Sequence, residues 1–168
     1  MLTTAVADNH RVHVSARADY AMRALVELVA LTRGDPARAV TAQTMAGRQE
    51  IPLKFLEAIL RDLRQAGILV AQRGPGGGYR LGRPAAAITV GDVVRAIDGP
   101  LAAVRGDRPE LVSYTGAAVP LQQVWIATRA ALRRVLDRVT LEDLVAGQLP
   151  PDVHALLDDA HAWGLPGR

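Results

Sequence analysis

The chain of 168 residues contains no cysteine. Disulfide bonds, thiol catalysis and cysteine-ligated metal or iron–sulfur sites are therefore excluded. Long hydrophobic runs are also missing, since no stretch approaches the roughly 20 apolar residues of a membrane span. The first residues, MLTTAVADNH, have neither the basic start nor the apolar segment of a secretory signal. We therefore expect a cytoplasmic protein with no membrane partner.

Residue types that commonly perform catalysis are scarce. The only serines are Ser15 and Ser113, and neither has a neighbouring His–Asp arrangement. No His-x-x-x-His pair or carboxylate cluster accompanies the histidines, which are His10, His13, His154 and His161. We predict that the chain is not an enzyme, that it has no catalytic or metal-binding residues and that it needs no cofactor.

Lysine is nearly absent as well, because Lys54 is the only lysine among 20 basic residues. Arginine suits phosphate and guanine, although codon usage in a GC-rich genome explains its excess at least as well. Residues 1–83 hold 12 Lys and Arg against 7 Asp and Glu, whereas residues 84–168 hold 8 against 10. A basic first half is what a polyanion-binding surface requires.

The stretch at residues 51–81 predicts a helix followed by a tight hairpin. Pro52 suits a first helical position and Gly67 a left-handed cap. The leucines between them recur every three or four residues, at Leu53, Leu56, Leu60 and Leu63. The turn RGPGGG at residues 73–78 separates two short apolar runs, at residues 68–71 and 79–81. This pattern is typical of a winged helix-turn-helix, whose helix enters the major groove of DNA and whose wing lies on the backbone or in a minor groove.

Caps and apolar spacing predict further helices at residues 15–33, 41–48, 89–97, 121–138, 141–146 and 152–163. We divide the chain into a flexible arm (1–11), a winged helix-turn-helix DNA-binding domain (12–100), a loop (101–119), a dimerisation helix with a following short helix (120–147) and a C-terminal helical extension (148–168). The predicted fold class is mainly α with a small β-hairpin.

The helix at residues 121–138 carries an apolar stripe that needs a partner. The members of the stripe are Leu121, Val124, Trp125, Thr128, Leu132, Val135 and Val139. The preceding domain is small and its own apolar faces have partners, so we expect the stripe to be buried against a second copy of the chain. Packing inside the monomer is the alternative.

The face opposite the leucines carries Lys54, Glu57, Ala58 and Arg61. Lys54 and Arg61 can reach phosphate or guanine, and Glu57 can accept a hydrogen bond from a cytosine amino group. The alternative is that Glu57 pairs with Arg61 on a solvated helix.

Arg73, at the tip of the predicted wing, can follow a narrow minor groove, and the neighbouring glycines permit close approach of the backbone. A solvated arginine on a flexible tip is the alternative. Ser15 and Arg17, at a helix N-terminus, could hold a backbone phosphate, although capping explains Ser15 equally well. The DNA-binding residues that we predict are Ser15, Arg17, Thr41, Gln43, Lys54, Glu57, Ala58, Arg61, Arg73, Gly76, Gly77 and Tyr79.

Six segments resemble the Rrf2 family of bacterial transcription regulators. They are VSARADYA (14–21), IPLKFLE (51–57), LRQAGIL (63–69), RGPGGGYRL (73–81), ITVGDVV (88–94) and TLEDL (140–144). The resemblance implies a homodimer built on the helix at residues 121–138 and a palindromic operator. It also implies base reading from Glu57 and its neighbours, and insertion of Arg73 into the minor groove.

The chain departs from the family where members with an iron–sulfur cluster carry their ligands. Those members have three cysteines six residues apart before the dimer helix, and some add a histidine. By position these residues are Asp107, Ser113 and Val119, with Gln122 in place of the histidine. The four cannot form a thiolate cage, so we expect no iron–sulfur cluster. Asp19 also stands where members often carry a basic residue, which puts one phosphate contact in doubt.

The sequence therefore predicts a nucleoid-associated transcription regulator that acts as a homodimer, as a repressor, and whose partners are double-stranded DNA and itself. Two alternatives stay open. One is a small-molecule-responsive regulator with an effector site between residues 101–119 and the dimer helix. The other is a protein-interaction module that docks a metabolic enzyme.

Overall fold

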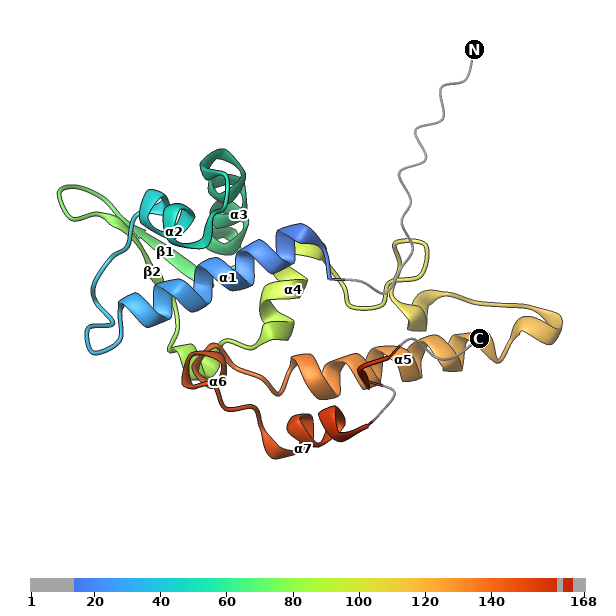
Figure 1. Ribbon diagram of the computed structural model, residues 1–168. Coiled ribbons are helices and arrows are strands. Elements are labelled where there is room, and N and C mark those ends of the chain that lie inside the picture. The colour runs from blue at the N-terminus through green and yellow to red at the C-terminus, as the bar shows by residue number, and fades with distance from the viewer. Residues whose placement is uncertain (1–13, 160–161, 165–168) are drawn as a thin grey trace, which may run out of the picture.

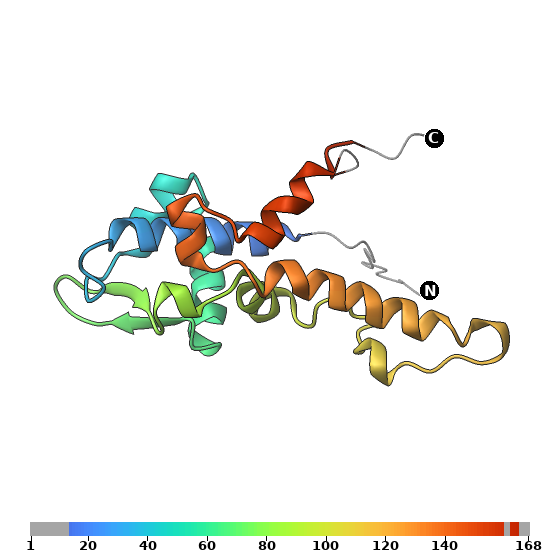
Figure 2. The same cartoon turned by 90° about the horizontal axis from the view of Figure 1, so that it is seen from below.

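The computed structural model describes residues 14–159 and 162–164 (Figure 1). The arm predicted at residues 1–11 lies outside the described residues. The fold is mainly helical with a two-stranded antiparallel hairpin, which confirms the predicted fold class. A head built from the first four helices and the hairpin occupies one end, and a long helix extends away from it (Figures 1 and 2). Within the described part of the chain, no helix has the length and apolar character needed to cross a bilayer.

The head contains three helices that the sequence predicted within a few residues. Helix α1 spans Ala16–Leu31, and the side chain of its N-cap Ser15 accepts from the backbone N–H of Ala18. Helix α2 spans Ala42–Gln49 and is capped by Thr41. Helix α3 spans Leu53–Gln65, so Pro52 stands at the N-cap and not at the first helical position. Gly67 has a φ of 69° after the helix, as its predicted capping role requires.

The core lies between α1 and α3 and is closed by α2, α4 and α6. Apolar side chains from these elements have no exposed surface. They include Leu25, Leu28, Met45, Leu56, Ile59, Leu60, Leu63, Ile88, Val93 and Leu141. Leu53 differs from the prediction, since it is 39% exposed, and Ile59 takes the inward place instead. The apolar face of a helix holds about four residues in every two turns. Leu53 lies at the edge of this face, in the first turn of α3.

The hairpin consists of β1 (Leu69–Gln72) and β2 (Gly78–Leu81), paired from Leu69 with Leu81 to Gln72 with Gly78. The other edge of β2 is also used, because Tyr79 exchanges backbone hydrogen bonds of 2.8 and 2.9 Å with Val40. The residues before α2 therefore hold the hairpin against the helix-turn-helix.

A short antiparallel bridge returns the chain to the head after the long helix. Helices α4 (Val90–Asp98) and α6 (Leu141–Ala146) both begin with capping boxes, Thr89 with Asp92 and Thr140 with Asp143. The two caps lie side by side: the N–H of Val90 donates to the carbonyl of Val139 (2.9 Å) and that of Leu141 to Ile88 (3.0 Å). The bridge fixes the place where the C-terminal end of α5 (Leu121–Leu136) meets the head.

An ion-pair cluster strengthens the same junction. Arg95 donates to Asp92 (2.9 Å) and to Asp137 (2.7 Å) at the end of α5. A Cβ added to Gly91 would lie 1.9 Å from the Asp137 carboxylate, so only glycine leaves that carboxylate in place. Partial burial opposes the charge of Asp92, but hydrogen bonds from the Thr89 backbone and from Arg95 outweigh it and hold the pKa of Asp92 below its ordinary value.

The C-terminal extension corrects one prediction. A single helix at residues 152–163 is wrong, because α7 covers only Pro151–His154 and continues as a 3-10 turn at Ala155–Asp158. Asp158 and Asp159 lie where the negative end of a helix dipole disfavours carboxylates. Leu156 and Leu157 are exposed, so no packing offsets the cost of a short helix.

We predict that Asp92→Asn lowers the free energy of unfolding at pH 7 by about 1 kcal/mol, because it weakens a capping box and two ion pairs. A carboxyl whose folded pKa is lowered stabilises the fold above its unfolded pKa, and the stabilisation is lost as the pH falls below 3.8. The difference between wild type and variant in urea unfolding should therefore shrink at pH 3. Asp107→Asn, at an exposed loop carboxylate, is the control. An equal difference at both pH values would contradict this account.

Candidate nucleic-acid interface

The outer face of α3 carries the charged residues predicted to read DNA. Lys54, Glu57 and Arg61 are exposed, while the leucines opposite them are buried in the core. Burial of one face therefore leaves the other free to face a ligand. Arg64 lies seven residues after Glu57, on the same face, and is also exposed. The sequence analysis missed Arg64, although its helical spacing was visible.

The charges on this face are unpaired. Among the described residues, no ion pair involves Lys54, Glu57 or Arg61, so the alternative of a Glu57–Arg61 pair is not found. Several arginines elsewhere in the head are engaged, as in Arg48 with Glu27 and Arg95 with Asp137. Free guanidinium and ammonium groups can therefore meet phosphates without first breaking a contact within the chain.

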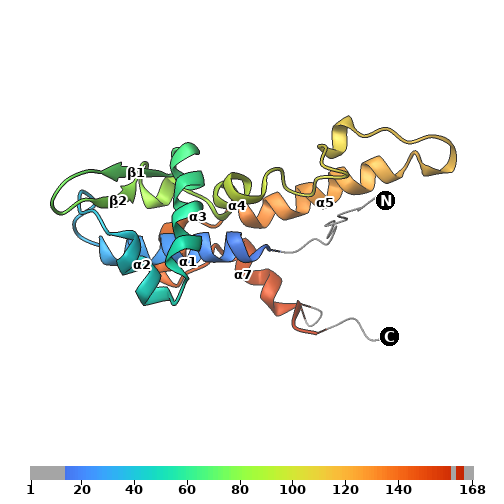
Figure 3. The same ribbon diagram turned by 90° about the horizontal axis from the view of Figure 1, so that it is seen from above.

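A shallow groove runs between α3 and the hairpin. Arg61, Arg64 and Gln65 form one side of it, and β1 forms the other with residues 69–71. Figure 3 shows α3 standing beside the hairpin at this end of the molecule. The basic residues of α3 thus lie beside the hairpin that carries the wing.

The wing is shaped by glycines that no other residue can replace without distortion. Gly74 and Gly76 have φ values of 91° and 73°. A Cβ at Gly77 would lie 2.5 Å from the Gln72 carbonyl oxygen and 2.7 Å from that of Gly74. The exposed side chain of Arg73 precedes this turn and has no ion pair in the described part of the chain. The turn can therefore bring its backbone and Arg73 close to a groove.

The predicted phosphate contacts at α1 are already used within the chain. The Ser15 hydroxyl donates to the Asp98 carboxylate (2.7 Å), and Arg17 forms an ion pair with Asp62 of α3. These contacts join α1 to α4 and α3, so any phosphate would share these groups with carboxylates. Their role in DNA binding stays a prediction.

Four other predicted positions lie at the start of α2, on α3 and on the hairpin. The Thr41 side chain accepts from the N–H of Thr44 (3.1 Å), as a cap does, and Gln43 is exposed in the first turn of α2. Ala58 is half-buried on α3. Tyr79 packs against the core, which shows a structural use for its ring. Whether any of these residues contacts DNA stays a prediction.

The loop at residues 101–119 is fastened to one face of α5. The Gln122 amide donates to the carbonyls of Pro109 (3.5 Å) and Glu110 (3.3 Å), and Trp125 Nε1 donates to the Tyr114 hydroxyl (3.0 Å). One turn further, Arg129 pairs with Glu110; its hydrogen bond lowers the pKa of that carboxyl. Polar side chains therefore hold this loop, which contains 3-10 turns at Pro109–Leu111 and Gly116–Ala118.

The predicted dimerisation stripe is divided by these contacts. Leu121 and Val124 are 41% and 50% exposed, but Trp125 is half-buried under the loop. Val139 is 5% exposed, so the chain itself covers it, because the bridge to α4 draws it into the head. Along the remaining part of the stripe, Leu121, Val124, Ala127 and Ala131 are exposed and Thr128 and Val135 are half-buried, and none of these six residues is charged.

The residues at the positions of cluster ligands do not suit iron. Asp107, Ser113 and Val119 are exposed and offer one carboxylate, one hydroxyl and a hydrocarbon, while the Gln122 amide is already bonded to backbone carbonyls. Among the residues that the structure describes, no group of three or more His, Cys, Asp or Glu side chains could hold a metal ion.

Two helices joined by a tight turn, with the second helix beside a glycine-rich hairpin, define a winged helix-turn-helix DNA-binding protein. Residues 14–147 match the family described as "Rrf2: Iron-dependent Transcriptional regulator". The chain belongs to the Rrf2 family and is a transcriptional regulator and not an enzyme.

Named relatives agree with this assignment. The chain is 43% identical over 153 residues to a candidate HTH-type transcriptional regulator of Mycobacterium tuberculosis, Rv1287, covering 89% of this chain and 91% of that one. It is 32% identical over 133 residues to the regulator CymR of Bacillus subtilis, covering 79% and 89%.

Solved structures show the same fold. The structure of CymR, described as the global cysteine regulator of B. subtilis, matches with a TM-score of 0.65 and 31% identity, over 81% of this chain and 98% of that chain. The structure of T. potens IscR matches with a TM-score of 0.61 and 27% identity, over 92% and 93%.

We predict that Gly77→Ala weakens DNA binding about tenfold, because the added methyl group forces the turn to move and displaces Arg73. The free energy of unfolding should fall by only about 1 kcal/mol, since the wing tip is exposed. Fluorescence anisotropy with a DNA duplex and urea unfolding measure the two effects. Gly47→Ala is the control, because its Cβ would meet nothing within 4 Å. Wild-type affinity of the Gly77 variant would mean that the wing does not contact DNA.

Proposed function

We propose that the chain is a repressor that binds a palindromic operator as a homodimer and works without an iron–sulfur cluster. The observation that carries this proposal is the unpaired basic face of α3 beside the glycine-rich wing. Lys54 and Arg61 are free for phosphate or guanine, and Glu57 is free for a cytosine amino group. A repressor needs no further chemistry, because occupying an operator excludes other proteins from it.

The open face of α5 supports the homodimer. Val124 and Leu121 stay exposed although the loop covers Trp125, and no element of the described chain buries them. An uncharged helical stripe of this kind is typical of a helix–helix interface. Two heads joined through α5 would place their α3 helices about one duplex turn (~34 Å) or a multiple apart, as a palindrome requires.

The contacts that hold the loop at residues 101–119 support the proposal of binding without a cluster. Its ion pair and hydrogen bonds to Arg129, Trp125 and Gln122 need no metal. The positions that carry thiolates in cluster-binding relatives offer none. We therefore propose that DNA affinity is the same in the presence and absence of iron chelators.

The wing arginine gives the test of DNA binding. Arg73→Ala should weaken binding to a promoter duplex roughly tenfold and reduce the slope of log K against log salt by about one unit, because one phosphate-region contact is lost. The matched control is Arg108→Ala, at an exposed arginine in the loop beyond the head, which should change neither quantity. If both variants keep the wild-type slope, Arg73 lies outside the interface.

The homodimer is tested on α5. Val124→Glu places a carboxylate on the open stripe, so the variant should sediment as a monomer at concentrations where the wild type is a dimer. Ala130→Glu, at an exposed position about a third of a turn around the same helix from Val124, should leave the dimer intact. A dimeric Val124 variant, or a wild type that is monomeric throughout, would show that α5 is not the interface.

A further inference from the structure

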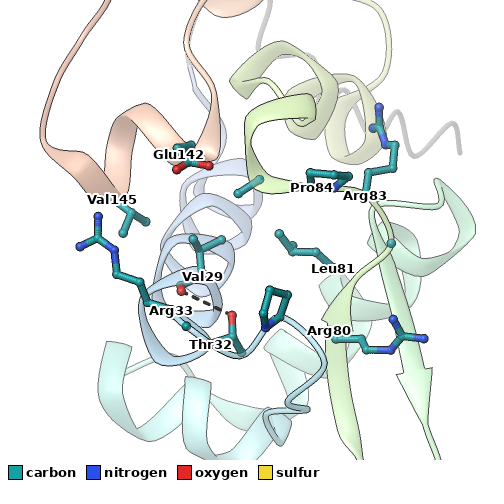
Figure 4. A pocket seen from close by; sticks show the side chains of 13 residues that line it. Val29, Thr32, Arg33, Arg80, Leu81, Arg83, Pro84, Glu142 and Val145 are labelled. Atoms are coloured by element: carbon teal, nitrogen blue, oxygen red, sulfur yellow. Dashed lines mark hydrogen bonds between the residues drawn. The ribbon is translucent and has the colours of Figure 1, made fainter.

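A cavity of about 510 Å³ opens where three elements meet, namely the last turn of α1, the segment that follows β2, and α6 (Figure 4). It is distinct from the α3–wing surface. It is also distinct from the place between the 101–119 loop and α5 where the sequence suggested an effector site. Its volume falls in the range of about 300–1,000 Å³ that small-molecule sites occupy.

The floor of the cavity is apolar. Its hydrocarbon surface comes from Val29 of α1, Leu81 of β2, Pro84 of the segment after β2, and Val145 of α6. Val29 and Leu81 also pack against the core, which makes this floor part of the rigid head. A hydrocarbon group could therefore bind there without a large rearrangement.

Three charged residues of the lining have no ion pair in the described part of the chain, namely Arg33, Glu142 and Arg80, and Arg80 lies across the cavity from the other two in Figure 4. Arg33 and Glu142 lie on the rim at the same side of the cavity. Two further polar residues of the lining are engaged, because Arg83 pairs with Asp92 and donates to the Ala87 carbonyl, and the Thr32 hydroxyl donates to the Leu28 carbonyl. At the side of the cavity where Arg33 and Glu142 lie, only these two of the described residues have their charges and hydrogen-bonding groups free for a ligand.

From this arrangement we infer that the cavity binds a free α-amino acid with an apolar side chain. The ligand carboxylate meets the planar fork of Arg33, which suits a bidentate contact. The ligand ammonium meets Glu142, and the apolar side chain lies on the floor near Val29 and Leu81. A carboxylate alone would leave Glu142 unused, and a polar side chain would lose its hydration on the floor.

The site lies beside the part of the fold that carries the wing. Leu81 is the last residue of β2, and β2 begins at Gly78, where the wing turn ends. An amino acid in the cavity therefore contacts the same strand whose other end joins the wing turn. This inference concerns binding to the protein alone and does not depend on the DNA-binding proposal.

Isothermal titration calorimetry of the full chain without DNA tests the inference, with L-leucine and L-phenylalanine as the probes. We expect saturable binding of at least one of them at millimolar concentration. Two analogues of leucine isolate its charges, since leucinamide lacks the carboxylate and 4-methylpentanoate lacks the ammonium group. Each analogue should bind about tenfold more weakly, the loss expected when a charge-assisted hydrogen bond is removed.

Substitutions of the two rim residues test where the ligand binds. Arg33→Gln and Glu142→Gln should each weaken binding about tenfold, whereas Arg108→Gln, in the distant loop, should leave it unchanged. Both rim residues are exposed, and far-UV circular dichroism and urea midpoints verify that the variants fold. The inference is overturned if neither amino acid binds, if the analogues bind as well as leucine, or if binding survives both rim substitutions. DNA binding by the same samples is measured separately, so failure here leaves that proposal standing.

Discussion

The bridge between the start of α4 and the start of α6 is the constraint on which the arrangement of this molecule depends. Two backbone hydrogen bonds, between Val90 and Val139 and between Leu141 and Ile88, fasten the end of α5 to the head. Arg95 adds a side-chain link to Asp137, for which Gly91 leaves room. Because α5 leaves the head in a fixed direction, a dimer formed through α5 holds its two α3 helices at a fixed separation. A palindromic operator can be read only under that condition.

The distribution of charge divides the molecule into a scaffold and a reading surface. In the scaffold, several arginines are matched with carboxylates, as in Arg17 with Asp62, Arg48 with Glu27 and Arg129 with Glu110. Such partly exposed pairs contribute little to stability, but they orient one helix against another. On α3 and the wing, the cations have no partners in the described part of the chain. A net charge of only +3 is therefore enough for a polyanion surface, because it is concentrated where it is unpaired.

Local signals in the sequence predicted most of the fold. Ser15, Thr41, Thr89 and Thr140 are each N-caps in the structure, because a side-chain hydroxyl beside a helical stripe acts on its own neighbours. Two departures from the prediction arise where the outcome depends on distant residues. The last helix is shorter than predicted because nothing packs on it, and Val139 is buried because of the bridge to α4.

The candidate site was predictable to a similar degree. The spacing of Lys54, Glu57 and Arg61 placed them on one face, and periodicity alone determines this for any amphipathic helix. That these charges lack partners, however, depends on where other helices lie, so the sequence left a Glu57–Arg61 pair open. The contacts between the 101–119 loop and α5 join residues 11 to 19 positions apart without a regular period. No pattern in the sequence indicates such contacts.

The central claim is that two identical heads read DNA from a fixed separation. Hydroxyl-radical footprinting of the full-length protein on a chromosomal fragment that it retains at physiological salt tests this claim most directly. Our account predicts two protected half-sites of related, inverted sequence whose centres lie about 10–10.5 base pairs, or a multiple of that, apart. A single protected patch, or half-sites whose separation changes from one fragment to the next, would contradict it.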